Sequence, residues 1–323
     1  TLFYALSALG LAGRIFGTDA VLYGSQSTWL ELLRPTRRPP EVPSVSAALF
    51  CVALVFPVYF VGANLLGRWG ARSGVYYQLL MAGATTLLVF GVLPWVVARL
   101  QRLNMSETFR LRRPPWIAFP AALLLGLALW PLAYEICLLN QWLGLLSFGQ
   151  DLIETVNRQL RYWRQVNVAL LIGTLAVCPA ICEEWLFRGY LFSSLSRVTS
   201  PTRAVLLSAT LFGAFHVVTS VLALERFLPS AFLGIALGWV CWRTRSILPG
   251  ILIHACHNSS VLLIAYYQSE LEALGLGHDE RAHLPLTWLV VSLASVLVGL
   301  GMLRFATRYL DVPSNRKKTA VAS

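Results

Sequence analysis

The chain has 323 residues, of which 57% are hydrophobic and 13% charged, and its formal net charge is +11. A soluble globular domain carries nearer 25% charged residues, so this composition excludes an ordinary soluble protein and indicates a surface that mostly faces lipid. The apolar stretches exceed the roughly 18 to 20 residues that a helix needs to cross a bilayer, and they lack the alternation of a membrane barrel. The sequence therefore predicts an all-α fold, a polytopic transmembrane helix bundle.

We predict about eight spans, whose ends are soft by several residues. In chain order they cover residues 44–66, 75–98, 115–138, 166–190, 203–224, 227–242, 247–267 and 285–305. Residues 2–12 are apolar but too short to span alone, and because the sequence does not begin with Met, a ninth span that starts before Thr1 is an open alternative. We expect an N-terminal membrane segment of two spans with basic loops (1–110), a core (111–310) and a basic, disordered tail (311–323).

Basic residues predict the orientation, because segments rich in Lys and Arg stay on the cytoplasmic side. With both termini cytoplasmic, 18 basic residues lie on the inner side and 7 on the outer side. The outer seven are Arg68, Arg72, Arg158, Arg161, Arg164, Arg226 and Arg281. This asymmetry and anionic lipid headgroups explain the net charge better than nucleic acid does. We predict an integral, multi-pass protein of a bacterial inner membrane.

The most expensive polar residues in the predicted spans are two adjacent acids, Glu183 and Glu184, near the end of the fourth span. A carboxylate in hydrocarbon costs several kcal/mol unless it is paired or faces a polar cavity, so the pair indicates a functional site. Glu184 and Arg188 are spaced i, i+4 and should form an ion pair with a structural role. Glu183 is rotated by about 100° from that face and remains free to act.

Three of the five histidines, His216, His254 and His257, also lie inside predicted spans. At about 1.5 Å of rise per residue, Glu183 lies roughly 5 to 10 Å from the inner end of its span, His254 roughly 10 Å and His216 roughly 20 Å. These residues could therefore line one cavity. His254 and Asn258 are spaced i, i+4 and present an imidazole and an amide, two donors that could stabilise an oxyanion. His257 lies on another face and is interpreted as packing.

Three motifs occur in order, each on its own hydrophobic helix. EEWLFR fits EExxxR, FGAFH (Phe212–His216) fits FxxxH, and HACHN (His254–Asn258) fits HxxxN. Over roughly residues 115–270 the chain resembles the CPBP family of intramembrane proteases (CAAX protease and bacteriocin-processing, or Abi), which includes the Rce1-type CAAX prenyl endopeptidases of glutamic type.

The resemblance implies a role for each motif residue. Glu183 and His216 would activate a water, and His254 and Asn258 would form the oxyanion hole. Glu184, Arg188 and Phe212 would be structural members of the motifs. The implied enzyme is an intramembrane endopeptidase that acts on a membrane-anchored or prenylated peptide or protein in the lipid bilayer, with no nucleic-acid partner.

Other readings of the same residues remain open. Glu183, His216 and His254 form a conceivable zinc ligand set, although HExxH is missing and we expect no cofactor. A proton-coupled transporter would use intramembrane Glu, His and Arg, but the first half of the chain contains no repeat of these motifs. A non-catalytic immunity accessory protein would not need all four presumed catalytic residues.

Two further patterns concern packing. Gly234 and Gly238 form a GxxxG that predicts close approach of two helices. Segment 144–165 carries Leu152, Val156, Leu160 and Trp163 at helical spacing between charges, which predicts an amphipathic helix on the outer surface.

Overall fold

The computed structural model describes residues 41–70, 74–143, 150–219, 226–273 and 283–308. Within these ranges the elements are helices, and the β-pairing consists of one isolated bridge between Leu111 and Ser246. Seven helices of the described chain are long and apolar enough to cross a membrane, and the remaining predicted span corresponds to α12. The predicted all-α, polytopic bundle is confirmed, and the chain is an integral, multi-pass membrane protein. The predictions for residues 1–40 and 309–323 lie outside the described residues.

The elements follow one another with short connections. The N-terminal part contains α3 (Val45–Gly70), α4 (Val75–Thr86), η2 (Leu87–Val92), α5 (Leu93–Leu100) and α6 (Met105–Thr108). The middle contains α7 (Ala118–Trp142), α8 (Gln150–Trp163), α9 (Val168–Ile172), η3 (Gly173–Val177), α10 (Cys178–Glu184), η4 (Trp185–Leu191) and α11 (Phe192–Val198). The C-terminal part contains α12 (Pro201–Thr219), α13 (Phe227–Thr244), α14 (Leu248–Tyr266), α15 (Gln268–Ala273) and α16 (Leu286–Thr307).

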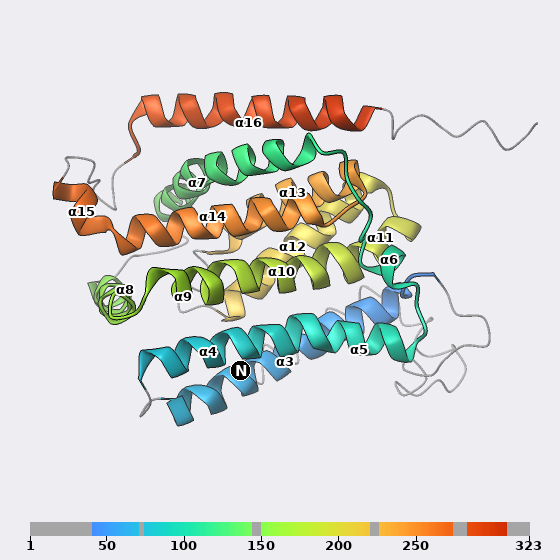
Figure 1. Cartoon of the computed structure of the whole chain (residues 1–323), viewed down its shortest axis with the longest axis horizontal. Coiled ribbons are helices and arrows are strands. Elements are labelled where there is room, and N and C mark those ends of the chain that lie inside the picture. Colours follow the sequence, from blue (N-terminus) through green and yellow to red (C-terminus); the bar gives the residue numbers. More distant parts are fainter. Residues whose placement is uncertain (1–40, 71–73, 144–149, 220–225, 274–282, 309–323) are drawn as a thin grey trace, which may run out of the picture.

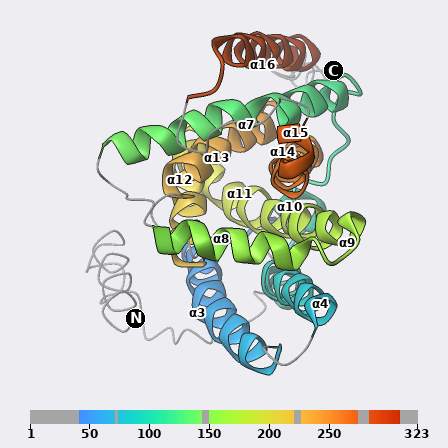
Figure 2. The same ribbon diagram turned by 90° about the vertical axis from the view of Figure 1, so that its left-hand side faces the viewer.

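The long helices lie side by side, with α10 and its continuations in the middle of the bundle (Figure 1). On one side, α10 packs against α14, α14 against α7, and α7 against α16; on the other side lie α3 and α4. Helix α12 packs along α13. The predicted amphipathic helix forms as α8, which crosses the end of the bundle (Figure 2).

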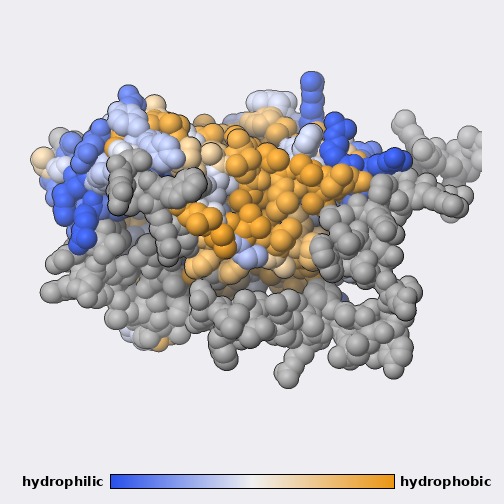
Figure 3. Space-filling view, turned by 90° about the horizontal axis from the view of Figure 1, so that it is seen from below, coloured by the Kyte–Doolittle hydropathy of each residue, from blue (hydrophilic) through white to orange (hydrophobic). Residues whose placement is uncertain are grey.

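The surface has the distribution that a bilayer requires. Apolar side chains form a continuous area in the middle of the face seen in Figure 3, and hydrophilic side chains gather at both ends. Large apolar residues of the spans, such as Leu88, Leu127 and Val291, are exposed rather than buried. Because such side chains would be costly in water, this area is the lipid-facing belt.

The helix that carries the acidic pair is longer than predicted. It runs as one 31-residue unit from Val168 to Val198, so the predicted inner end at residue 190 was wrong. Serines lower the hydropathy after 190, but Ser193 and Ser194 are buried in protein, and the Ser193 hydroxyl donates to the carbonyl of Tyr190. Glu183 therefore lies in the middle of its helix rather than near the end.

This helix alternates between α and π geometry. The π-helical segments η3 and η4 flank α10, and η4 begins immediately after Glu184. A π-helical turn widens the helix and frequently marks a functional site. The local geometry thus singles out the segment that holds the acidic pair.

The GxxxG motif packs as predicted. A Cβ atom at Gly234 would lie 3.0 Å from Cα of Ala209, and one at Gly238 would lie 3.3 Å from Cγ1 of Val205. Larger side chains at these positions would separate α12 from α13. The glycines therefore allow close contact between the helix that carries His216 and its neighbour.

Candidate active site

The carboxylate of Glu184 and the guanidinium of Arg188 form an ion pair in the interior. Nη1 of Arg188 lies 2.8 Å from Oε1 of Glu184, and both side chains are 0% exposed. Nη2 of Arg188 donates to the carbonyl oxygen of Gly234 at 3.0 Å, and the guanidinium stacks over the Phe212 ring at 4.4 Å. The predicted ion pair is confirmed, and it links α10 and η4 to α12 and α13.

Glu184 has a second partner that helical spacing does not reveal. Its Oε1 atom lies 3.2 Å from Nδ1 of His254, which is buried on α14. A carboxylate oxygen accepts, so Nδ1 of His254 carries the donated proton when Glu184 is ionised. The Nε2 atom of His254 is thereby directed away from Glu184.

Glu183 faces both of the motif histidines. Its Oε2 atom lies 3.9 Å from Nε2 of His216 and 3.8 Å from Nε2 of His254. The Glu183 side chain is 12% exposed, and Oε2 has no hydrogen-bond partner within the described residues. The two distances are too long for direct hydrogen bonds. The structure therefore brings Glu183, His216 and His254 together from three helices, α10, α12 and α14.

His216 is held by its own helix. Its Nδ1 atom lies 2.9 Å from the carbonyl oxygen of Phe212, one turn earlier. Because a carbonyl can only accept, Nδ1 carries the proton and the neutral ring presents a free lone pair at Nε2, toward Glu183. The Phe212 ring packs against both imidazoles, with ring centroids 4.6 Å from His216 and 5.7 Å from His254.

The structure shows fewer contacts for Asn258 and His257, the other two polar residues of the HACHN segment. Asn258 follows His254 by one turn on α14 and is partly buried. Its catalytic role stays a prediction. His257 is buried on the same helix, and its Nδ1 atom has no hydrogen-bond partner within the described residues.

The sequence did not predict a cluster of three aromatic side chains, Tyr59, Phe90 and Phe215, next to His216. The Tyr59 ring of α3 makes edge-to-face contacts with Phe90 and Phe215, at centroid distances of 5.7 and 5.8 Å. Phe215 directly precedes His216, and Tyr59 lies within electrostatic range of Glu183. Apolar spans are full of aromatic residues that only pack, so no signal in the sequence distinguishes these three.

A second missed residue is Arg226, which directly precedes α13. Its charge lies within electrostatic range of the Glu183 carboxylate. The sequence placed it among the outer loop arginines. Helix α13, which begins one residue later, packs along α12, the helix that carries His216.

The side chains around Glu183 include the residue types that bind zinc. Among the described residues, no group of three His, Cys, Asp or Glu side chains is arranged to hold a metal ion. Glu183, His216 and His254, the zinc alternative, do not form such a group as they stand.

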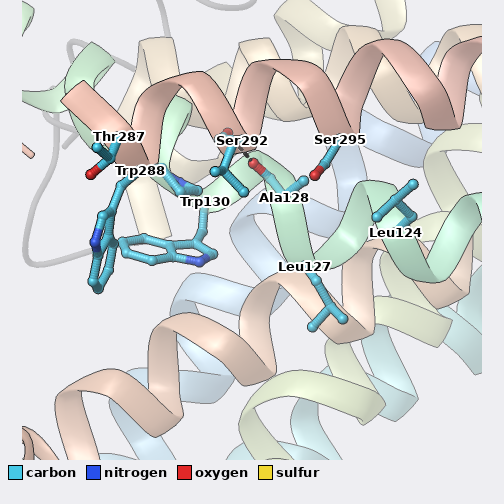
Figure 4. A pocket seen from close by; sticks show the side chains of 10 residues that line it. Leu124, Leu127, Ala128, Trp130, Thr287, Trp288, Ser292 and Ser295 are labelled. Carbon is cyan, nitrogen blue, oxygen red and sulfur yellow. Dashed lines mark hydrogen bonds between the residues drawn. The ribbon is translucent and has the colours of Figure 1, made fainter. Parts of the chain in front are cut away.

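A surface groove of about 520 Å³ between α7 and α16 lies apart from these residues (Figure 4). Trp130 and Trp288 meet edge to face at one end of it, and the Ser292 hydroxyl donates to the carbonyl of Ala128 at 2.6 Å. The groove opens beside apolar, exposed side chains and contains none of the motif residues. The groove is therefore separate from the motif residues, which lie in the interior.

Comparison with known families matches residues 165–260 to the type II CAAX prenyl endopeptidase Rce1-like family. The matched segment contains all three motifs, and over this segment the resemblance to Rce1-like proteins is confirmed. A comparison with curated proteins gives no match. A comparison with solved structures also gives none.

Proposed function

We propose that this membrane protein is an intramembrane endopeptidase that hydrolyses a peptide bond of a membrane-anchored or prenylated substrate without a metal. At the level of the family, the Rce1-like match implies a membrane-embedded protease of CAAX type. The observation that carries the proposal is the convergence of Nε2 of His216 and Nε2 of His254 on Oε2 of Glu183, at 3.9 and 3.8 Å.

The spacing of these atoms suits a bridging water. Polar atoms 3.8 to 3.9 Å apart cannot bond directly, but a water about 2.8 Å from each can join them. Glu183, as a carboxylate, would accept one proton of that water. His216 would accept the other hydrogen bond at Nε2, because its Nδ1 proton is already donated to Phe212. Together they would orient the water oxygen for attack.

The reaction then follows from proton balance. The water oxygen bonds to the scissile carbonyl carbon while Glu183 takes the released proton, which gives a tetrahedral intermediate with a negative oxygen. Collapse of the intermediate breaks the C–N bond, and Glu183 returns the proton to the leaving nitrogen. The products are a carboxylic acid and an amine, and Glu183 is again ionised.

Stabilisation of the negative oxygen is assigned to His254 and Asn258. Nδ1 of His254 donates to Glu184, so a donor at Nε2 requires the doubly protonated ring. The ionised Glu184 beside it supplies the counter-charge for that imidazolium. The Asn258 amide, one turn later, would supply a second donor. In this scheme Glu184 acts on the reaction through His254, in addition to its ion pair with Arg188.

The substrate class can be tested with the protein reconstituted in liposomes. Three fluorescence-quenched reporters would share one cleavable sequence, which is farnesylated in the first, fused to a transmembrane helix in the second and soluble in the third. We expect cleavage of one or both anchored reporters and little cleavage of the soluble one. Equal cleavage of all three would contradict the requirement for a membrane anchor.

A further inference from the structure

A cavity of about 530 Å³ that is lined by polar residues lies between α4 and α8. Helix α8 crosses this end of the bundle (Figure 2). Its lining consists of Gln78, Arg158, Gln159, Arg161, Tyr162 and Gln165. Every one of these side chains carries a hydrogen-bond donor, and the described residues that line the cavity include no carboxylate. Such a lining suits a ligand that is anionic and rich in acceptor oxygens.

The cavity lies at the boundary between the polar end of the bundle and its lipid-facing belt. Gln78 is in the first turn of α4, just after Tyr76 and Tyr77, whose side chains are exposed. Exposed tyrosines at the start of an apolar span are typical of the headgroup level of a bilayer. Arg158 and Arg161 are exposed on α8 at the same end.

The floor of the cavity is held in place by packing. Tyr162 and Trp163 pack against a cluster that includes buried Val75 and Leu79 of α4. After α8, Nη2 of Arg164 donates to the carbonyl of Ala265 at 3.3 Å. The arginines at 158 and 161 thus project from a helix whose backbone is anchored on both α4 and α14, so both are held at the same end of the bundle.

We propose that this cavity binds the phosphate headgroup of an anionic phospholipid. Three of the seven basic residues on the predicted outer side, Arg158, Arg161 and Arg164, belong to α8 and the residue that follows it. A concentration of arginine on that side is unfavourable for topology, and a lipid phosphate would add counter-charge to the two acids of the same helix, Asp151 and Glu154. The planar guanidinium donates two parallel hydrogen bonds to a phosphate, and the amides complete the site. The site is independent of Glu183 and of the proposed hydrolysis.

Native mass spectrometry of the detergent-solubilised protein, titrated with phosphatidylglycerol or phosphatidylcholine, tests this proposal. We expect phosphatidylglycerol to be retained preferentially, and Arg158→Gln/Arg161→Gln to weaken its retention by about tenfold or more. A control with the same loss of charge is Arg113→Gln/Arg203→Gln, which removes two exposed arginines on the predicted inner side and should retain the lipid. Equal retention by both double variants, or no preference for phosphatidylglycerol, would overturn the proposal.

Two further experiments test whether the charge of the arginines is what matters and whether the ligand is a lipid or a free anion. Arg158→Lys/Arg161→Lys keeps the charge and should retain more lipid than the Gln pair, whereas equal loss in both would contradict an electrostatic site. Inorganic phosphate at millimolar concentration should not displace the lipid, because it lacks the acyl chains that the adjoining belt contacts. Displacement that requires both arginines would assign the cavity to a free anion instead.

Discussion

The Nδ1 atom of His254 lies 3.2 Å from Oε1 of Glu184 and donates a hydrogen bond to it. The same oxygen accepts from Arg188 at 2.8 Å. One buried carboxylate thus joins the ion pair of the EExxxR motif to the histidine of the HxxxN motif. Of the two adjacent acids, Glu184 orients a neighbour and Glu183 faces the space between the imidazoles.

This relationship predicts that Glu184→Gln slows catalysis. A neutral amide would no longer balance the charge of a doubly protonated His254, so stabilisation of the developing oxyanion would weaken. We expect kcat to fall by about 100-fold, with little change in KM. Steady-state kinetics on the anchored reporter would measure both. A fall confined to the amount of folded enzyme, with kcat per folded molecule unchanged, would show that Glu184 is only structural.

Arg188→Met should destabilise the protein. It leaves the carboxylate of Glu184 buried without its guanidinium, and breaking a buried pair in this way typically costs about 3 to 5 kcal/mol. Thermal unfolding in detergent should show a clear loss of stability. The double variant Glu184→Gln/Arg188→Met removes both charges and should recover part of the loss. If the single variant is as stable as the native protein, the pair does not hold these helices together.

Gly250→Ala tests the placement of Glu184. A Cβ atom at Gly250 would lie 3.1 Å from Oε2 of Glu184, so the carboxylate must shift by a few tenths of an ångström. Since a displacement of about 1 Å can cost up to about 100-fold in rate, this smaller shift should lower activity by less than that factor, while stability changes little. A matched control is Gly301→Ala on α16, where a Cβ atom would meet nothing within 4 Å. Reporter cleavage and melting temperature would be measured for both, and equal activity in the two variants would contradict the geometry.

Chelation tests the proposal that no metal takes part. After prolonged treatment with EDTA and 1,10-phenanthroline, and removal of the chelators, reporter cleavage should persist. Elemental analysis of the treated protein would verify that zinc is gone. Activity that disappears and returns with added zinc would favour the zinc alternative, with Glu183, His216 and His254 as the ligand candidates.

The features that could be predicted from the sequence are those set by the order of residues within a single helix. Amphipathicity, span length and the i, i+4 spacing of Glu184 and Arg188 are local properties, and the structure confirms the helix bundle and the ion pair. The structure also brings Glu183, His216 and His254 close together, while their catalytic roles stay predictions. This proximity could be predicted from the motifs and from the depth of each residue in its span, because the spans contain few other polar side chains.

Relations between helices were not predictable in the same way. The bond from His254 to Glu184 depends on the rotation of α14 against α10, and spacing within one helix does not fix that rotation. The end of the fourth span was misplaced because hydropathy measures contact with lipid, whereas residues 191–198 continue the helix with serines that are buried in protein or that bond to their own backbone. In the sequence Tyr59 resembles any other aromatic residue of a span, and only the packing of α3 against Phe90 and Phe215 distinguishes it.

The most direct test of the central claim is the rate at which Glu183→Gln cleaves the anchored reporter, per folded molecule. The change is nearly isosteric and removes only the base, so we expect the rate to fall at least about 100-fold while the melting temperature is nearly unchanged. Glu107→Gln, which alters a partly exposed carboxylate paired with Arg112, is the matched control and should keep the native rate. A Glu183→Gln enzyme as fast as this control would contradict the account.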